Sequence, residues 1–313
     1  MNMAITASGL RKSYGDKAVL DGIDLSIGAG TIFSLLGPNG AGKTTTVNVL
    51  TTLLKADGGT AHVAGHDLAT APQAVRAAIG VTGQFAAVDE LLTGEENLRM
   101  MADLHRLKGG ERKRVVSELL ERFDLAESAK KRSSTYSGGM RRKLDLAMTL
   151  VTRPQIVFLD EPTTGLDPRS RRTMWEIVRE LTSGGVTIFL TTQYLDEADQ
   201  LADRIAVLDQ GRIVAEGTPD DLKRQVPGSH IRLRFTTIGE LDSAARALPG
   251  STRDDEALTL RVPDSGGTKS LRLLLDRLAE SAIEAEEVSV HTPDLDDVFL
   301  SLTGHATTEA TAS

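Results

Sequence analysis

Apolar runs and amphipathic segments alternate along the first 225 residues of the chain. Short runs rich in β-branched and aromatic residues predict buried strands, and segments with apolar side chains at helical spacing predict helices. The predicted strands cover residues 31–36, 156–159, 186–190, 205–208 and 212–215, and the predicted helices cover residues 44–54 and 169–181. The last two strands flank Gln210 and Gly211, which predicts a hairpin. This order predicts an α/β domain with a mixed sheet, mostly parallel with antiparallel additions.

The pattern breaks at Pro227 and Gly228 and then continues in a different order. Beyond the break, strands are predicted at 230–235, 257–262 and 287–290, and helices at 240–248, 269–282 and 295–302. We therefore expect two domains, one over residues 1–225 and a small acidic α+β domain over residues 228–304. Residues 305–313 are rich in Ala and Thr, and we expect them to form a disordered tail.

The bulk composition narrows the classes of function. With 313 residues, of which 40% are hydrophobic, the chain can form two domains of ordinary size. A net charge of −8 and only 4% aromatic residues disfavour a nucleic-acid partner, which would call for a basic face and stacking side chains. The absence of cysteine excludes disulfides and cysteine-based zinc sites. The N-terminus lacks the apolar segment of a signal peptide, and no apolar stretch approaches the ~18–20 residues that span a bilayer. We therefore expect any membrane role to come through a partner protein.

A phosphate-binding loop is predicted directly after the first of these strands. Residues 37–44 read Gly-Pro-Asn-Gly-Ala-Gly-Lys-Thr and fit the pattern G-x-x-x-x-G-K-[ST]. The glycines let backbone N–H groups approach phosphates, Lys43 supplies a charge, and the Thr44 hydroxyl suits Mg²⁺. The alternative, a Gly-rich turn that only caps a helix, is disfavoured because spacing and the strand–loop–helix context agree. The predicted nucleotide-binding residues here are Gly37, Pro38, Asn39, Gly40, Ala41, Gly42, Lys43, Thr44 and Thr45.

Two carboxylates follow a second apolar run, at the end of residues 155–162. A buried strand would place Asp160 at the sheet edge, beside the phosphate loop, where it can bind Mg²⁺, through water. Glu161 would then lie where a general base orients the attacking water. Alone, the pattern equally suits a strand that ends in a solvated acidic turn, but the upstream phosphate loop favours the catalytic interpretation.

A second anion-ready segment begins the helix predicted over 141–150. Ser137 and two glycines precede it, and such a start presents free backbone N–H groups. By itself this pattern indicates a simple helix cap just as well.

In this order, the motifs resemble those of the ATP-binding subunits of ABC transporters, across about residues 4–220. The resemblance implies a P-loop NTPase domain of the ABC ATPase type, with a mixed sheet and a helical signature subdomain. It also implies that Tyr14 stacks on adenine, Gln84 touches the metal, Asp160 binds the metal and Glu161 is the catalytic glutamate. The signature residues would be Ser137, Gly138 and Gly139, and the D-loop residue would be Asp167.

The resemblance further implies partners and cofactors. Members of the family work as head-to-tail dimers, so we expect a homodimer with ATP sandwiched between Lys43 of one subunit and Ser137 to Gly139 of the other. The cofactors would be ATP and Mg²⁺, with Thr44, Gln84 and Asp160 toward the metal. A separate multi-span permease would hold the protein peripherally at the cytoplasmic face of the membrane. The small second domain would serve assembly or regulation.

The chain departs from the family pattern in two places. Tyr136 and Met140 replace the usual Leu and Gln of the signature, without removing the serine or the glycines. Gln193 stands where the family normally has the switch histidine. An amide donates a hydrogen bond but carries no proton or charge near neutral pH. Gln193 can therefore do the same positional job, or hydrolysis can be slower and depend more on Glu161.

Residues 191–204 and 293–304 resemble the subgroup that serves daunorubicin and doxorubicin exporters. The resemblance favours ATP-driven efflux of a hydrophobic drug. Export of a lipid or polysaccharide by the same architecture remains an alternative, because this subunit does not contact cargo. A soluble ATPase acting on DNA or ribosomes is disfavoured by the acidic charge and the single nucleotide site. The change at Gln193 leaves open a nucleotide-gated assembly protein with weak hydrolysis.

Overall fold

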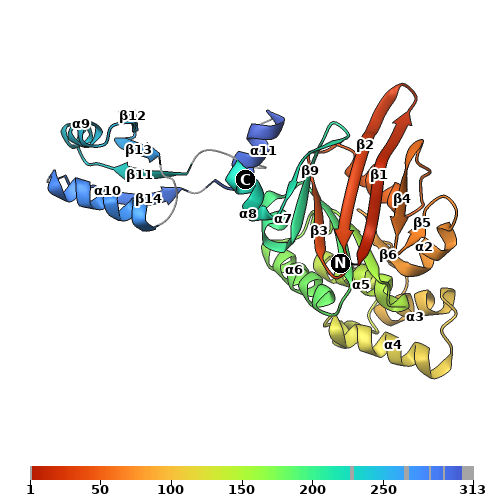
Figure 1. Ribbon diagram of the computed structural model, residues 1–313. Coiled ribbons are helices and arrows are strands. Elements are labelled where there is room, and N and C mark those ends of the chain that lie inside the picture. Colours follow the sequence, from red (N-terminus) through yellow and green to blue (C-terminus); the bar gives the residue numbers. More distant parts are fainter. Residues whose placement is uncertain (1, 226–228, 264–267, 282, 292, 305–313) are drawn as a thin grey trace. The chain divides into compact units, whose positions relative to one another are not determined.

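The computed structural model describes residues 2–225, 229–263, 268–281, 283–291 and 293–304 (Figure 1). The chain divides into two units, Met1–Pro219 and Asp220–Ser313. The predicted break at Pro227 and Gly228 and the predicted disordered tail at 305–313 lie outside the described residues. The described part of the chain has no helix that is both long and apolar enough to cross a membrane.

A six-stranded mixed sheet forms the centre of the first unit, in the order β10-β9-β3-β8-β7-β6. All neighbouring strands are parallel except β9 and β10, which form the predicted antiparallel hairpin. The mixed sheet is thus confirmed. Its strands are β3 (Ile32–Leu36), β6 (Ile79–Thr82), β7 (Ile156–Asp160), β8 (Thr187–Thr192), β9 (Arg204–Asp209) and β10 (Arg212–Gly217).

The strand register brings three strand ends to one edge of this sheet. Asp160 at the end of β7 pairs with Thr191, and Leu36 at the end of β3 pairs with Thr192. Every residue of β3, β7 and β8 is buried, because helices and a second sheet cover the central sheet. Residues that follow these strands therefore meet at the carboxyl edge, where open α/β sheets bind ligands.

A second, antiparallel sheet has the order β2-β1-β4-β5 and shares an apolar core with the central sheet. Phe33 of β3 and Phe189 of β8 stack at 5.6 Å between ring centroids within this core. The strands are β1 (Met3–Tyr14), β2 (Lys17–Gly28), β4 (Gly58–Val63) and β5 (His66–Asp67).

Seven α-helices in the described part of the first unit complete the layers, and three of them form the helical part expected around the signature. Apolar residues of α3, α4 and α5, among them Leu98, Leu119 and Leu144, pack against one face of the central sheet. The antiparallel sheet packs against the other face. The helices are α1 (Lys43–Leu50), α2 (Pro72–Ala78), α3 (Gly94–Leu104), α4 (Gly109–Arg122), α5 (Gly138–Thr149), α6 (Pro168–Ser183) and α7 (Leu195–Leu201).

The first helix is shorter than predicted. The apolar pattern predicted a helix to residue 54, whereas α1 ends at Leu50. Thr51 caps the helix, and Thr52 has a φ of 65°, which a continuing right-handed helix does not allow. The prediction was wrong at this end because the Leu53 and Leu54 pair mimics helical spacing beyond the turn.

The second unit contains an antiparallel sheet in the order β12-β13-β11-β14, covered by helices (Figure 1). Its apolar core includes Ile231, Leu233, Phe235 and Leu274, and the buried Thr259 is uncharged. The α+β character expected of this region is thus confirmed. The elements are α8 (Pro219–Gln225), β11 (His230–Arg234), α9 (Ile238–Ala247), β12 (Thr252–Asp254), β13 (Thr259–Pro263), α10 (Thr268–Glu280), β14 (Glu287–His291) and α11 (Leu295–Thr303).

Candidate nucleotide site

The predicted phosphate loop connects the end of β3 to the start of α1. Two of its glycines stand where a side chain would not fit. A Cβ atom on Gly37 would lie 2.3 Å from the carbonyl oxygen of Leu208, and one on Gly42 would lie 2.8 Å from that of Val19. Gly42 also has a φ of 112°, a conformation that favours glycine. As the N-cap of α1 it leaves the first helical N–H groups facing the loop, so the loop is built to present backbone donors to an anion.

Lys43 is buried beneath this loop, with 4% of its surface exposed. Its ammonium donates to the carbonyl oxygens of Gly37 at 2.7 Å and Pro38 at 3.1 Å, and it lies 3.2 Å from Oε1 of Glu161. Burial lowers the pKa of Lys43, while the neighbouring Glu161 carboxylate opposes this change. The structure therefore brings two of the predicted residues together as a buried ion pair.

Asp160 and Glu161 are both buried at the end of β7, and Thr191 of β8 holds them. The Thr191 hydroxyl donates to Oδ1 of Asp160 at 2.5 Å, and the Glu161 N–H donates to both oxygens of Thr191 at 3.1 Å. Glu161 has a φ of 48°, which costs a non-glycine residue on the order of 1–3 kcal/mol. Residues held in this way cluster at functional sites.

Four further predicted residues are exposed or half-buried. Tyr14 ends β1 with 53% of its surface exposed, and the Lys12 ammonium lies 5.9 Å from its ring centroid. Thr44 and Gln84 are exposed, and Gln193 is half-buried directly after β8. No hydrogen bond or ion pair in the described part of the chain joins these four residues to the Lys43–Glu161 pair.

The predicted signature and D-loop segments meet at Ser170 of α6, which lies beside Gly139 and binds Asp167. Ser137 caps α5 by accepting a hydrogen bond from the Met140 N–H at 3.2 Å. A Cβ atom on Gly139 would lie 2.6 Å from Oγ of Ser170, so only glycine allows α5 to approach α6 this closely. The Ser170 hydroxyl donates to Asp167, which caps α6, at 2.5 Å. This hydrogen bond is the main reason that the pKa of Asp167 lies below its usual range.

The structure gives a physical reason for both departures in the signature. The Tyr136 hydroxyl donates to the carbonyl oxygen of Ser128 at 2.7 Å, a bond that leucine cannot form. It also fills the space beside Gly94, where a Cβ atom would lie 2.3 Å from the hydroxyl. Met140 packs against the apolar core of the helical part. Both side chains therefore stabilise the packing of the helical part. The signature keeps its serine and both glycines.

Sequence reasoning missed a buried charged pair on α5. Arg142 and Asp145 are 7% and 4% exposed, and their side chains lie 3.4 Å apart. With Thr149 they form a polar stripe at i, i+3 and i+7 on a helix whose other inward residues are apolar. That spacing is the signal that could have revealed the pair.

Glu197 of α7 was also missed. Its side chain is fully buried, and Oε1 accepts hydrogen bonds from Thr163 at 2.8 Å and from Nε1 of Trp175 at 3.1 Å. Burial raises the pKa of Glu197. Glu197 therefore links α7, which follows Gln193, to Thr163, which lies two residues after Glu161. No spacing in the sequence predicts this contact, because the three residues come from separate segments.

The donors around the loop fit a magnesium nucleotide. The loop has a backbone cradle that a Cβ atom would fill, and Lys43 provides a cation beside it. Thr44, Gln84 and Asp160 offer hydroxyl, amide and carboxylate oxygens, the ligands that Mg²⁺ prefers. The described residues contain no group of three or more His, Asp or Glu side chains that could hold a metal alone.

Comparison with known proteins agrees with this geometry. The ABC transporter family model matches residues 20–164. The daunorubicin resistance ATP-binding protein DrrA3 of Streptomyces coeruleorubidus is 51% identical over 96% of both chains. The daunorubicin/doxorubicin resistance ATP-binding protein DrrA of Streptomyces peucetius is 48% identical over 96% of this chain and 93% of its own.

Among solved structures, the ATP-binding cassette MJ0796, a dimer in a post-hydrolysis state bound to ADP and Pi, superposes with a TM-score of 0.62. It is 25% identical, and the match covers 68% of this chain and 98% of that one. The chain therefore belongs to the ATP-binding subunits of ABC transporters, ATPases whose hydrolysis of ATP is coupled to transport.

Proposed function

We propose that this chain binds and hydrolyses ATP to drive the export of a hydrophobic drug through a separate membrane permease. The observation that carries the proposal is the buried cluster of Lys43, Asp160 and Glu161 at the carboxyl edge of the central sheet. A drug as cargo is supported by the two Streptomyces relatives, both of which are named for daunorubicin resistance.

Each predicted residue then has a role in phosphoryl transfer. Lys43 exchanges its Glu161 partner for phosphate oxygens, which frees the Glu161 carboxylate to orient water as the general base. Thr44, Asp160 and Gln84 would hold Mg²⁺, which neutralises charge on the phosphates. Tyr14, exposed at the end of β1, stacks on adenine. Gln193 does the positional job of the switch histidine with its amide.

The working form is a head-to-tail homodimer with two ATP molecules between the subunits. Ser137, Gly138 and Gly139 at the start of α5 cap the nucleotide held by Lys43 of the other subunit. The dimeric state of the related cassette MJ0796 supports this arrangement. The protein is peripheral at the cytoplasmic face of the membrane, bound to its permease.

The test is drug retention in the source cells after chromosomal replacement of the gene. With Lys43→Ala we expect several-fold higher daunorubicin accumulation than in wild type. Arg204→Lys, a change in an exposed pair with Glu216, serves as the matched control and should leave accumulation unchanged. Equal accumulation in the Lys43→Ala cells would contradict drug export. Loss of a lipid or polysaccharide from the cell surface in those cells would point to the other cargo.

A further inference from the structure

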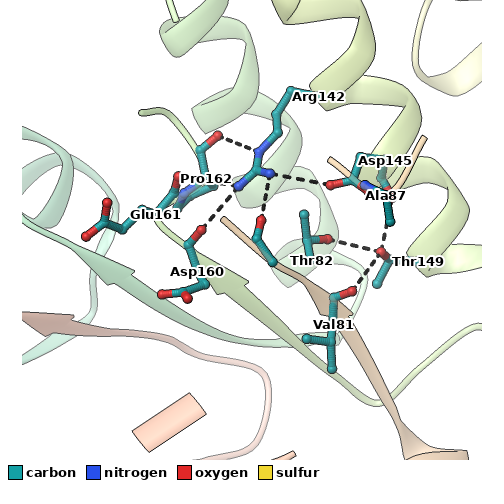
Figure 2. Close-up of polar contacts among 10 residues, drawn as sticks. Val81, Thr82, Ala87, Arg142, Asp145, Thr149, Asp160, Glu161 and Pro162 are labelled. Carbon is teal, nitrogen blue, oxygen red and sulfur yellow. Dashed lines mark hydrogen bonds and ion pairs between the residues drawn. The ribbon is translucent and has the colours of Figure 1, made fainter. Parts of the chain in front are cut away.

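Arg142 of α5 connects two segments that carry predicted site residues (Figure 2). Its Nε donates to the Pro162 carbonyl at 2.9 Å, and its Nη2 donates to the carbonyls of Asp160 at 3.2 Å and Glu161 at 3.3 Å. Its Nη1 donates to the Gly83 carbonyl at 2.8 Å and lies 3.4 Å from Asp145. All five N–H groups of the guanidinium therefore have an acceptor.

Three of these acceptors are the consecutive carbonyls of residues 160–162, around the proposed general base Glu161. Glu161 has the left-handed φ of 48°, so its backbone persists only if the surroundings fix it. Thr191 binds this backbone through the Glu161 N–H, and Arg142 binds it through the carbonyls on both sides. The direction of the Glu161 side chain depends on both contacts.

The fourth carbonyl belongs to Gly83, the residue before Gln84. Asp145 holds the same segment a few residues later, because its Oδ1 accepts from the Ala87 N–H at 2.9 Å. One turn further along α5, the Thr149 hydroxyl lies 3.0 Å from that of Thr82 (Figure 2). The side chains of Arg142, Asp145 and Thr149 on α5 thus bind the chain on both sides of Gln84.

We propose that Arg142 is a positioning residue for ATP hydrolysis. It fixes the backbone of Glu161 and holds residues 82–87, the segment that contains Gln84, in a set position relative to Glu161. This inference rests on the proposed function, because it assigns a role to Arg142 in the same site. In this role Arg142 acts through the two segments that it joins.

Lysine cannot replace this arginine in such a role. A guanidinium is a planar fork with five fixed donors, whereas an ammonium is a point charge with three. Lys at position 142 would keep the charge opposite Asp145 but could not reach carbonyls of both segments together. Arg142→Lys therefore separates the role of charge from the role of geometry.

The experiment compares wild type, Arg142→Lys and the control Arg204→Lys as full-length proteins. We expect Arg142→Lys to lower kcat for ATP by roughly 10- to 100-fold, the effect of a small misplacement of catalytic groups, with KM within about 3-fold. In hydrogen exchange without nucleotide, amides of residues 82–88 and 160–164 should exchange about tenfold faster, while the rest of the first unit keeps its rates. Arg204→Lys should match wild type in both assays.

Two results would overturn the proposal. One is an unchanged kcat in a folded Arg142→Lys protein. The other is exchange that accelerates evenly over the first unit, which a purely structural role predicts. If Arg142→Lys does not fold, the double variant Arg142→Gln/Asp145→Asn removes both buried charges, and it should show the same loss of kcat. A normal kcat in that variant would mean that Arg142 only neutralises Asp145.

Failure of the proposed function would look different. Wild type would then show no turnover, and the Arg142→Lys exchange pattern would still decide whether Arg142 ties the two segments together.

Discussion

In the unit Met1–Pro219 six charged side chains are buried, whereas in the described part of Asp220–Ser313 every buried side chain is uncharged. Burying a charge is costly unless it is paired and hydrogen-bonded, and well-packed apolar residues would often serve stability as well. The buried charges therefore indicate a role other than stability. They are Lys43, Arg142, Asp145, Asp160, Glu161 and Glu197.

The second unit shows which interactions are sufficient to fold a domain without buried charges. Its core is apolar, and its ion pairs lie at the surface, such as Arg234 with Glu286 and Glu287 and Arg253 with Asp242. Exposed pairs of this kind contribute little to stability. The difference between the units separates charges kept for chemistry from charges kept for solubility.

The largest expected effect comes from removing the cation under the phosphate loop. Lys43→Ala should lower ATP turnover by roughly 10³-fold, because an electrostatic contact to the phosphates is lost. It should also weaken ATP binding, measured by equilibrium dialysis with labelled ATP. Arg153→Ala, at an exposed pair with Glu118, is the control and should leave both unchanged. Normal turnover in Lys43→Ala would contradict the claim that the buried charges of the first unit are kept for chemistry.

A smaller effect is expected at Glu197, where burial raises the pKa. Below the ordinary glutamate pKa of about 4.3, folded and unfolded chains both hold the proton, and stability is complete. As the pH rises, the unfolded chain releases the proton first, so the contribution of Glu197 to stability is lost as the pH rises through its folded pKa. Glu197→Gln removes this titration and keeps an oxygen for Thr163 and Trp175.

The stability of Glu197→Gln relative to wild type should therefore increase from pH 4.5 to pH 7. Urea denaturation followed by the fluorescence of Trp175, the single tryptophan of the chain, measures this for the first unit. A stability difference that stays constant over this pH range would show that Glu197 titrates normally, and that its burial has no electrostatic cost.

The smallest effect is expected in the second unit. Arg234→Ala breaks the exposed pairs with Glu286 and Glu287 and should cost less than about 1 kcal/mol. Hydrogen exchange of peptides from β11 and β13 measures the local stability. A cost of several kcal/mol would mean that surface charges hold this unit together, and the contrast between the units would fail.

The sequence was sufficient for the parts of the site that are linear motifs. The loop at 37–44 and the carboxylates 160 and 161 could be predicted because each follows an apolar strand, and strand ends meet at one sheet edge. The structure joins Lys43 to Glu161 as that reasoning requires. The catalytic and metal-binding roles of these residues remain predictions until turnover is measured.

The contacts of Arg142 could not be predicted in the same way. Its acceptors are backbone carbonyls, which have no signature in the sequence, and Gly83 lies 59 residues away along the chain. The end of α1 was missed for a related reason, because the positive φ of Thr52 is a backbone property that apolar spacing does not report.

The most direct test is Mg-ATP turnover by the purified full-length chain, compared with Glu161→Gln. The account predicts that wild type hydrolyses ATP and that the variant binds ATP but turns over roughly 10²- to 10⁴-fold more slowly, because its general base is gone. That result would also show that Gln193 is compatible with hydrolysis. Equal turnover by the two proteins, or none by either, would contradict the assignment of Glu161 as the catalytic base.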